Sequence, residues 1–262
     1  MREPIIHVAI QAARAAGNVI SRAANRLDKV TIAEKMPNDF VTDVDQRAEQ
    51  EIISIIHKAY PSHGIIGEES GTTSGEDYQW IIDPLDGTRN FIHGFPHFAV
   101  SIGVMYRDKI EYGVIYDPMR QELFTAKRGS GAQLNERRIR VAGKRVLRDC
   151  LLGTGFAGRH EHPENTQESL EVLDRVLPIC GDIRRAGAAA LDLAYVAAGR
   201  LDGFWEFGLK IWDIAAGILL VKEAGGMIVD PLGGESYWQT GDIVAANPTV
   251  IKHMLRAIKQ PS

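Results

Sequence analysis

The segment that most constrains this chain places two aspartates three residues apart at the end of an apolar run: Trp80-Ile81-Ile82-Asp83-Pro84-Leu85-Asp86-Gly87-Thr88. The isoleucines indicate the end of a buried strand, and the proline and glycine favour a turn directly after it. Two carboxylates about 4 Å apart repel each other by roughly 4 kcal/mol at an effective dielectric of ~20. A cation between them removes this repulsion, and oxygen ligands suit a hard divalent ion such as Mg²⁺. The segment therefore predicts a metal site at a strand end.

Length and composition place the chain among ordinary globular proteins with a large core. It has 262 residues, of which 45% are hydrophobic and 24% charged, enough for one large domain or two fused halves. The net charge of −4 argues against direct nucleic-acid binding, which needs a basic surface. The local run of basic residues between Arg137 and Arg148 is typical of a solvated strand and loop.

Targeting signals are not evident in the chain. The first residues are Met1-Arg2-Glu3-Pro4, and the apolar stretch after them is interrupted by polar residues, unlike a signal peptide. No uninterrupted apolar run is long enough to span a bilayer. The two cysteines, Cys150 and Cys180, do not provide a disulfide framework. We therefore expect a cytoplasmic protein that does not associate with a membrane.

Apolar periodicity predicts two N-terminal helices followed by a run of strands. Helical spacing extends over about 4–27 and 43–59, with Thr42 as the expected N-cap of the second helix. Short apolar segments predict strands at 65–66, 80–82, 98–106, 110–116 and 123–126. Asp108 and Lys109 are expected to form the turn between two of them. Helices followed by successive strands indicate a largely antiparallel sheet.

The pattern changes near residue 140, after which strands and helices alternate. Strands are predicted at 151–154, 201–207, 226–229 and 242–246, and helices at 164–177, 188–198, 212–224 and from 249 onward. Alternation favours an α/β half with a more parallel sheet. We therefore expect an N-terminal α+β half, 1–140, and a C-terminal α/β half, 141–262. The halves should pack as one functional unit, with the site at their junction.

Further acids occur at other strand ends and helix starts. Glu68 and Glu69 follow a predicted strand, Asp213 lies at the start of an apolar helix, and Asp45 lies in the first turn of the second helix. Each also has a purely structural explanation. Asp213 fits a helix cap, Asp45 fits a capping box with Thr42, and the glutamates fit a solvated loop. Spacing alone leaves both explanations open for each acid.

The residues after the aspartate pair predict an anion site beside the metal site. The stretch Gly87-Thr88-Arg89-Asn90 can begin a helical turn whose free N–H groups hold a phosphate. Carboxylates for a metal next to donors for an anion are typical of phosphoryl transfer. The chain contains no nucleophile elbow, Walker loop or dinucleotide-binding glycine pattern.

These segments closely resemble the inositol monophosphatase family of magnesium-dependent, lithium-sensitive phosphatases, and its bacterial branch most of all. The matching motifs are Gly67-Glu68-Glu69-Ser70, the Trp80–Thr88 segment and Trp212-Asp213-Ile214-Ala215-Ala216-Gly217. The resemblance covers essentially the whole chain. It implies a layered αβαβα sandwich of the inositol monophosphatase/fructose-1,6-bisphosphatase type, of mixed α+β and α/β character, and a homodimer.

The resemblance also implies a ligand set for Mg²⁺. Glu68, Asp83 and the backbone carbonyl of Leu85 would hold a first ion. Asp83, Asp86 and Asp213 would hold a second, and Glu68 would help to hold a weaker third. Most of these ligands belong to the N-terminal half, and Asp213 completes the site from the C-terminal half.

Catalytic and substrate-binding groups follow from the same resemblance. Asp45 and Thr88 would orient and deprotonate the attacking water, with Glu68 among the catalytic residues through its metal. The backbone N–H groups of Gly87 and Thr88 would bind the phosphate. The positions that match those near the substrate hydroxyls are Asp86, Gly187, Ala189 and Glu206. No phosphoenzyme intermediate is expected.

The expected substrate is myo-inositol 1-phosphate or a similar small monophosphate of a polyol. Sister specificities toward fructose 1,6-bisphosphate, histidinol phosphate or a 3′-phosphorylated nucleotide stay open, because the metal ligands do not separate them. Glu206 favours a polyol, since a carboxylate accepts hydrogen bonds from vicinal hydroxyls. Arg89 occupies a position where the family often has threonine, and its effect on phosphate binding is open. Resemblance to bacterial relatives also implies a regulatory partner in the transcription machinery.

Overall fold

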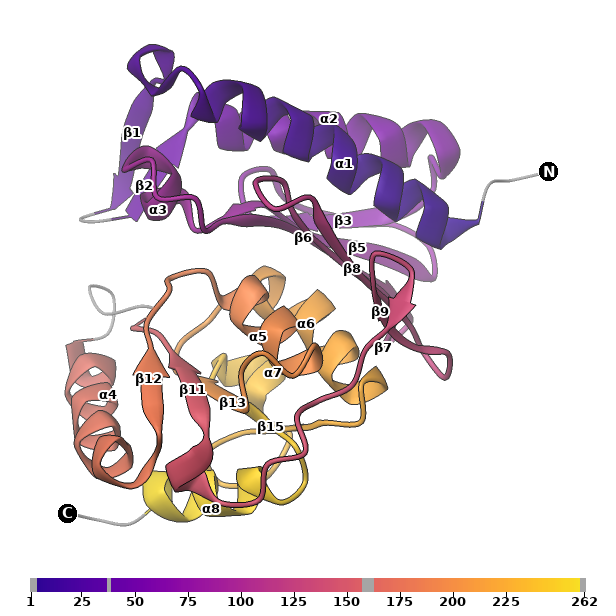
Figure 1. The fold of residues 1–262 in the computed structure, drawn as a ribbon. Helices are drawn as coiled ribbons and strands as arrows, with labels where there is room; N and C mark the ends of the chain where they lie inside the picture. Colours follow the sequence, from indigo (N-terminus) through magenta and orange to yellow (C-terminus); the bar gives the residue numbers. More distant parts are fainter. Residues whose placement is uncertain (1–3, 37–38, 157–162, 260–262) are drawn as a thin grey trace.

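Helices and sheets alternate in five layers, helix–sheet–helix–sheet–helix (Figure 1). The computed structural model describes residues 4–36, 39–156 and 163–259. In order, the helical layers are α1 (Ile5–Ala24) with α2 (Asp43–Ala59), α5 (Ala189–Ala197) with α6 (Ile211–Glu223), and α4 (Pro163–Val176) with α8 (Val250–Lys259). This arrangement is the predicted αβαβα sandwich.

The first sheet has eight strands in the order β10-β9-β8-β7-β6-β5-β3-β4. Their bounds are β3 (Gly64–Gly67), β4 (Gly71–Thr73), β5 (Tyr78–Asp86), β6 (Ala99–Tyr106), β7 (Lys109–Asp117), β8 (Glu122–Lys127), β9 (Gly131–Leu134) and β10 (Arg137–Arg138). Every neighbouring pair is antiparallel except β3 and β5, which confirms the prediction of a largely antiparallel sheet. The β6–β7 turn consists of Arg107 and Asp108, one residue earlier than predicted, and Arg107 adopts a φ of 51°.

The second sheet has five strands in the order β12-β11-β13-β15-β14. Their bounds are β11 (Leu151–Thr154), β12 (Asp182–Arg184), β13 (Gly203–Glu206), β14 (Met227–Val229) and β15 (Ile243–Ala246). β12, β11 and β13 are parallel, whereas β15 runs antiparallel to both of its neighbours. The prediction of a more parallel second sheet is confirmed. β12 was not predicted, because two of its three residues are charged.

Thr42 caps α2 as predicted. Its side chain accepts hydrogen bonds from the N–H groups of Val44 and Asp45, and Asp45 Oδ2 accepts one from Thr42 N over 2.8 Å. The segment between α1 and α2 contains β1 (Ile32–Met36) paired with β2 (Asp39–Thr42), two strands that were not predicted. The remaining short elements are η1 (Leu27–Lys29), α3 (Thr88–Ile92), η2 (Leu147–Asp149), η3 (Leu177–Ile179) and α7 (Tyr237–Thr240).

Three hydrophobic clusters fill the spaces between the layers, and the strands supply them by alternation. Successive side chains of a strand point to opposite faces. Ile82 therefore packs with α1 and α2, whereas Ile81 packs with α5 and α6. In β13, Phe204 lies in the middle cluster and Trp205 in the outer one beside α4 and α8. The middle cluster contains residues from both sides of position 140, so they share a core. The domain boundary itself stays a prediction.

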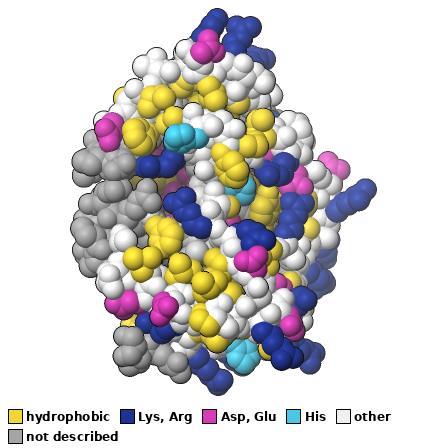
Figure 2. Space-filling view, turned by 60° about the vertical axis from the view of Figure 1, so that its left-hand side comes forward, with side chains coloured by type: hydrophobic (Ala, Val, Ile, Leu, Met, Phe, Trp, Pro, Cys, Tyr) yellow, Lys and Arg dark blue, Asp and Glu magenta, His cyan; other side chains and the backbone are white. Residues whose placement is uncertain are grey.

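The described surface carries charge of both signs. On the face shown in Figure 2, Lys and Arg side chains occur in several separate places, among hydrophobic and acidic ones. The absence of direct nucleic-acid binding stays a prediction. Of the helices in the described ranges, none has the length and hydropathy required to cross a membrane.

Candidate active site

A β-bulge at the end of β5 turns two aspartates toward the same side of the first sheet. Asp83 pairs with Ser101 of β6 and Asp86 with Ala99, so a step of three residues on β5 spans a step of two on β6. Pro84 lies inside this bulge, where its missing N–H does not interrupt the ladder. Positions 99 and 101 share one face of β6. Asp83 and Asp86 consequently point toward the middle helical layer.

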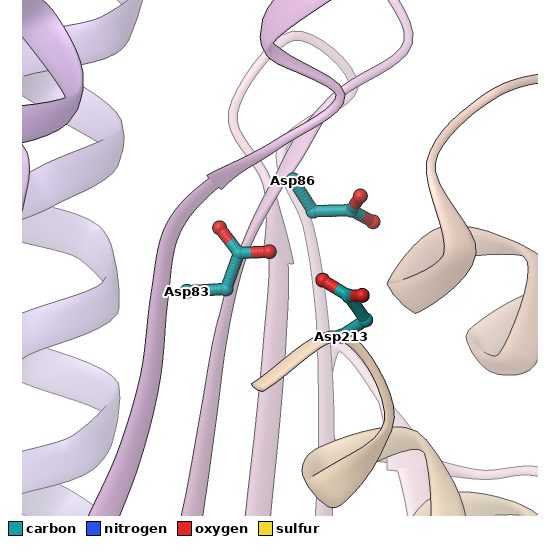
Figure 3. Close-up of side chains that lie close together, drawn as sticks. All are labelled: Asp83, Asp86 and Asp213. Carbon is teal, nitrogen blue, oxygen red and sulfur yellow. The ribbon is translucent and has the colours of Figure 1, made fainter. Parts of the chain in front are cut away.

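Close packing of α6 on this sheet brings a third aspartate to the pair. A Cβ atom at Gly103 would lie 2.8 Å from Ala215 Cβ, and one at Gly113 would lie 2.8 Å from Ala216 O. Only glycine leaves room for the helix to lie so close to the strands. Asp213 in the first turn of α6 therefore lies beside the end of β5, and the three carboxylates lie close together (Figure 3).

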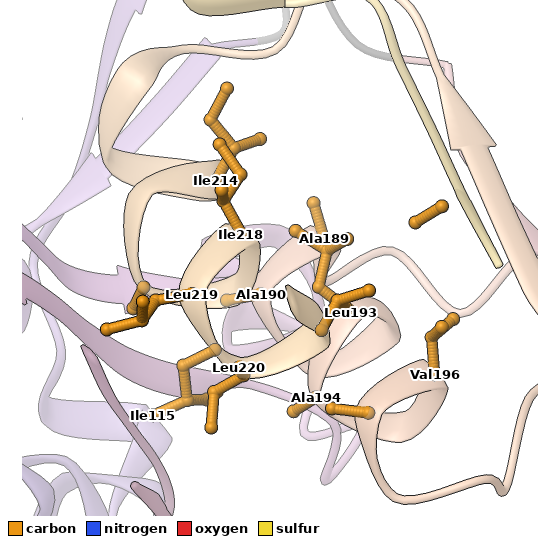
Figure 4. Packing of buried hydrophobic residues seen from close by; sticks show 14 of the residues in the cluster. Ile115, Ala189, Ala190, Leu193, Ala194, Val196, Ile214, Ile218, Leu219 and Leu220 are labelled. Carbon is orange, nitrogen blue, oxygen red and sulfur yellow. The ribbon is translucent and has the colours of Figure 1, made fainter. Parts of the chain in front are cut away.

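The packing of α5 against α6 fixes Asp86 from the other side (Figure 4). A Cβ atom at Gly217 of α6 would lie 2.5 Å from Leu193 Cδ1 of α5, so the two helices are in close contact. This contact places the N-terminus of α5 beside the bulge, where Ala190 N donates to Asp86 Oδ2 over 2.7 Å. Asp213 Oδ2 accepts from Lys210 N over 2.7 Å. The N-cap residue of α6 is Lys210, and Asp213 is the third residue of the helix, where it forms part of a capping box rather than the predicted cap itself.

The three carboxylates form a group suited to a hard cation. One oxygen from each of Asp83, Asp86 and Asp213 lies within 4.8 Å of the others. Burial and the charges of Glu68, Asp86 and Asp213 raise the pKa of Asp83 well above its usual range. Burial raises the pKa of Asp213 to about 6, and burial with the charge of Asp213 raises that of Asp86. Carboxylates that repel one another and offer only oxygen ligands fit a divalent cation such as Mg²⁺.

Two other predicted ligands lie at the edge of this group. Glu68 N donates to Ile82 O over 3.2 Å, which places Glu68 next to Asp83, although its carboxylate is not one of the three mutually close ones. The Leu85 carbonyl lies 3.0 Å from the Thr88 hydroxyl, and Leu85 N donates to Asp83 Oδ1 over 2.9 Å. Metal ligation by Glu68 and Leu85 stays a prediction.

Asp45 and Thr88, the expected water-activating pair, are in direct contact. The Thr88 hydroxyl lies 2.9 Å from Asp45 Oδ1, although the two residues are far apart in the chain. Asp45 is 1% exposed, and burial raises its pKa against the opposing effect of its hydrogen bonds from Thr42 and Thr88. Asp45 is therefore a capping-box residue that also contacts Thr88. The capping role is compatible with the expected catalytic role, which stays a prediction.

The turn that leads into α3 is held by a side chain not predicted for the site. Gly87 has a φ of 93°, and a Cβ there would lie 3.0 Å from His97 O. Asn90 Nδ2 donates to His97 O over 2.8 Å and to Ala186 O over 2.9 Å. Asn90 thus ties α3 to the segment before Gly187.

The Arg89 guanidinium lies 5.2 Å from the centre of the Phe40 ring.

The predicted substrate positions surround the same end of α5. Gly187, with a φ of 84°, precedes the helix, and Ala189 is its first residue. Glu206 ends β13 and is 7% exposed, and its carboxylate fills the place where a Cβ of Gly155 would lie. Asp192 is also buried, and burial with the charge of Glu206 raises its pKa. An acid inside an otherwise apolar helix is a sequence signal that singles out Asp192.

Comparison with known proteins gives consistent matches over nearly the whole chain. The sequence profile of the inositol monophosphatase family matches residues 1–261. A Pseudomonas aeruginosa protein named Nus factor SuhB is 51% identical over 261 residues, which are 98% of this chain and 96% of that protein. The crystal structure of extragenic suppressor protein SuhB from Bartonella henselae matches with a TM-score of 0.95 and 45% identity, covering 98% of this chain and 99% of that one. An inositol monophosphatase from Anabaena matches with a TM-score of 0.86 and 38% identity, covering 98% and 96%.

Proposed function

This chain belongs to the inositol monophosphatase family, and on that premise we propose that it is a magnesium-dependent phosphomonoesterase. Family membership by itself supports a metal-dependent phosphatase. The proposed substrates are myo-inositol 1-phosphate and similar small monophosphates of polyols. The observation that carries the proposal is the convergence of Asp83, Asp86 and Asp213 from β5 and α6 within 4.8 Å.

The acidic residues are proposed to hold magnesium in the way the family resemblance implies. Glu68, Asp83 and the Leu85 carbonyl would hold one ion, and Asp83, Asp86 and Asp213 another. When bound, magnesium supplies Lewis acidity, which lowers the pKa of water and neutralises charge on phosphate oxygens. The raised pKa values of the free carboxylates support this assignment, because a cation would relieve their mutual repulsion.

The remaining groups are proposed to handle the water proton and the phosphate. Asp45, held by Thr42 and Thr88, would accept a proton from the attacking water. The raised pKa of Asp45 suits a general base, whose efficiency is best near the working pH. The N–H groups of Gly87 and Thr88, at the start of α3, would donate to the phosphate oxygens.

Selectivity for a polyol is proposed to come from Glu206. Its buried carboxylate can accept hydrogen bonds from adjacent hydroxyls, whereas it would repel a second phosphate. Gly187 and Ala189 would form the neighbouring wall with their backbone. Bisphosphates are therefore proposed to be poorer substrates than the inositol ester.

The test of the proposed function is phosphate release from myo-inositol 1-phosphate, with and without Mg²⁺, beside fructose 1,6-bisphosphate and adenosine 3′,5′-bisphosphate. Magnesium-dependent release with preference for the inositol ester is expected, and full activity after exhaustive chelation would contradict the metal assignment. Preference for a bisphosphate would overturn the substrate assignment alone. Family resemblance adds two further proposals, inhibition by lithium and a homodimer, the second measurable by light scattering.

A second, regulatory role is proposed from the names of relatives. The Pseudomonas aeruginosa relative is named a Nus factor, and we propose by likeness that this chain also has a partner in the transcription machinery. In a strain that lacks the gene, an Asp86→Ala variant separates the two roles. Rescue by this variant would favour the partner, and failure of rescue alongside success of the wild type would favour phosphatase activity.

A further inference from the structure

Glu49 is a buried acid of α2 that no step of the proposed mechanism uses. It lies one helical turn after Asp45, on the same face of α2, and is 2% exposed. A buried carboxylate requires hydrogen-bond donors or a positive charge to be tolerated. Within the described part of the chain, its hydrogen-bond donor comes from the turn between β3 and β4 that contains Glu68.

The contacts of Glu49 converge on the residues directly after Glu68. Glu49 Oε1 accepts from Glu69 N over 3.1 Å. Burial raises the pKa of Glu49 against the lowering effect of Glu69 and Ser70. In the same turn, Glu68 N donates to Ile82 O of β5. The Glu68 backbone is therefore held between β5, which carries Asp83, and the Glu49 carboxylate.

Gly67 supplies a second, steric observation. A Cβ atom at this position would lie 2.2 Å from Glu49 Oε1 and 2.6 Å from Ser70 Oγ. The Glu49 carboxylate and the Ser70 hydroxyl thus occupy the place that a side chain at position 67 would take. Gly67 is not among the residues with positive φ, so the need for glycine here is spatial. The absence of a side chain at Gly67 therefore allows the Glu49 carboxylate to occupy this space.

From these contacts we propose that Glu49 is a positioning residue, which holds the Glu68–Ser70 turn so that the Glu68 carboxylate faces the metal site beside Asp83. The inference rests on the proposed function, because it assumes that Glu68 binds a metal. Without Glu49, the Glu69 N–H group loses this acceptor, and the turn between β3 and β4 loses a contact that holds it to α2. Loss of groups that orient a metal ligand typically lowers metal affinity or activity about 10–100-fold.

The experiment measures Mn²⁺ binding by electron paramagnetic resonance in the full-length protein and its variants. Glu49→Ala should weaken the tightest Mn²⁺ site about 10–100-fold and raise the Mg²⁺ concentration for half-maximal phosphate release. Glu49→Gln should lose less, because its amide oxygen can still accept from Glu69 N. The control is Glu51→Ala, which removes an exposed glutamate from the same helix and should bind Mn²⁺ as the wild type does.

A double-mutant cycle tests the contact with Gly67 directly. Gly67→Ala should weaken Mn²⁺ binding, because its methyl group collides with the Glu49 carboxylate. In the double variant with Glu49→Ala that collision is absent, so the combined loss should be clearly smaller than the product of the two single losses. Independent effects, which multiply, would contradict the proposal, as would wild-type Mn²⁺ affinity in Glu49→Ala.

Hydrogen exchange of the peptide that covers Glu69 and Ser70 gives a readout that does not depend on catalysis. Exchange there should be faster in Glu49→Ala than in the wild type or Glu51→Ala, and unchanged exchange would overturn the proposal. If Glu49→Ala does not fold, Glu49→Gln and Gly67→Ala carry the same test. If the wild type has no phosphatase activity, the proposed function fails. Mn²⁺ affinity and exchange still decide whether Glu49 positions the turn.

Discussion

The Ser101 hydroxyl donates a hydrogen bond to the Trp212 carbonyl over 3.2 Å. Ser101 is the strand partner of Asp83, and Trp212 precedes Asp213 in the chain. This single contact therefore joins the strand beside one carboxylate to the helix start that carries another. Ser101 is fully buried, so water cannot replace it as the donor.

Ser101→Ala should loosen the placement of Asp213 relative to Asp83. Loss of one buried hydrogen bond should cost about 1 kcal/mol of unfolding free energy, while the Mg²⁺ requirement of phosphate release should rise by about tenfold. Thermal unfolding and a Mg²⁺ titration measure the two effects. Ser130→Ala, at an exposed turn, is the control. An unchanged Mg²⁺ requirement would show that α6 is held by packing alone.

Asp83→Asn should abolish turnover and stabilise the metal-free protein. The substitution removes the carboxylate shared by both proposed ions, and it also removes a buried charge that three other acids repel. In EDTA, Tm should rise by a few degrees, since about 1 kcal/mol corresponds to ~2–4 °C in a chain of this size. Asp77→Asn, at an exposed residue, is the control for both measurements. Retention of near-normal activity would exclude the assigned metal site.

The stability of the metal-free protein should fall as the pH rises. The pKa of Asp213 is raised to about 6 from 3.8, and those of Asp83 and Asp86 are also raised. Between the unfolded and folded pKa values the folded state binds more protons, so unfolding becomes easier as these protons are lost. In EDTA, Tm should decrease from about pH 4.5 to about pH 7. Saturating Mg²⁺ should flatten this decrease, and equal slopes with and without Mg²⁺ would contradict the assignment.

Glu206→Gln should impair the inositol ester more than a phosphate ester that lacks hydroxyls. An amide offers one acceptor oxygen where the carboxylate offers two. Kinetics should show KM for myo-inositol 1-phosphate rising about tenfold, equivalent to ~1.4 kcal/mol, with a much smaller change for p-nitrophenyl phosphate. Glu235→Gln, at an exposed site, serves as the reference. Equal effects on both esters would place Glu206 outside the polyol pocket.

Element types were predictable where a periodic pattern or a cap was strong. The α2 start at Asp43 follows from Thr42 and the apolar spacing, and the buried strand β5 follows from its apolar run. β1 and β12 were missed because each contains two charged residues. β1 pairs with the neighbouring strand β2, and β12 pairs with β11, which is distant in the chain. The β6–β7 turn lies one residue earlier than predicted, because Arg107 adopts a positive φ, a conformation that generally favours glycine.

The acids of the site were predictable from spacing and resemblance, but their supports were not. Glu49, Asn90 and Ser101 act through contacts with segments that only the folded chain brings near. Nothing in the local sequence of Ser101 distinguishes it from any other strand serine. The contact between Ser101 and Trp212 depends on the packing of α6 against Gly103 and Gly113, which periodicity does not describe.

The bulge at Pro84 allows two aspartates separated by an odd number of positions on β5 to point to the same face of the sheet. In a regular strand, residues three apart point to opposite faces. Asp83 and Asp86 share a face only because β5 has one residue more between them than β6 has between their partners, Ser101 and Ala99. Deletion of a single residue from this segment would keep every acid in the chain. It would nevertheless restore the regular ladder at an even spacing and remove the kink that aims the chain into α3. The geometry of this segment thus depends on the number of residues between the two aspartates as well as on their chemistry.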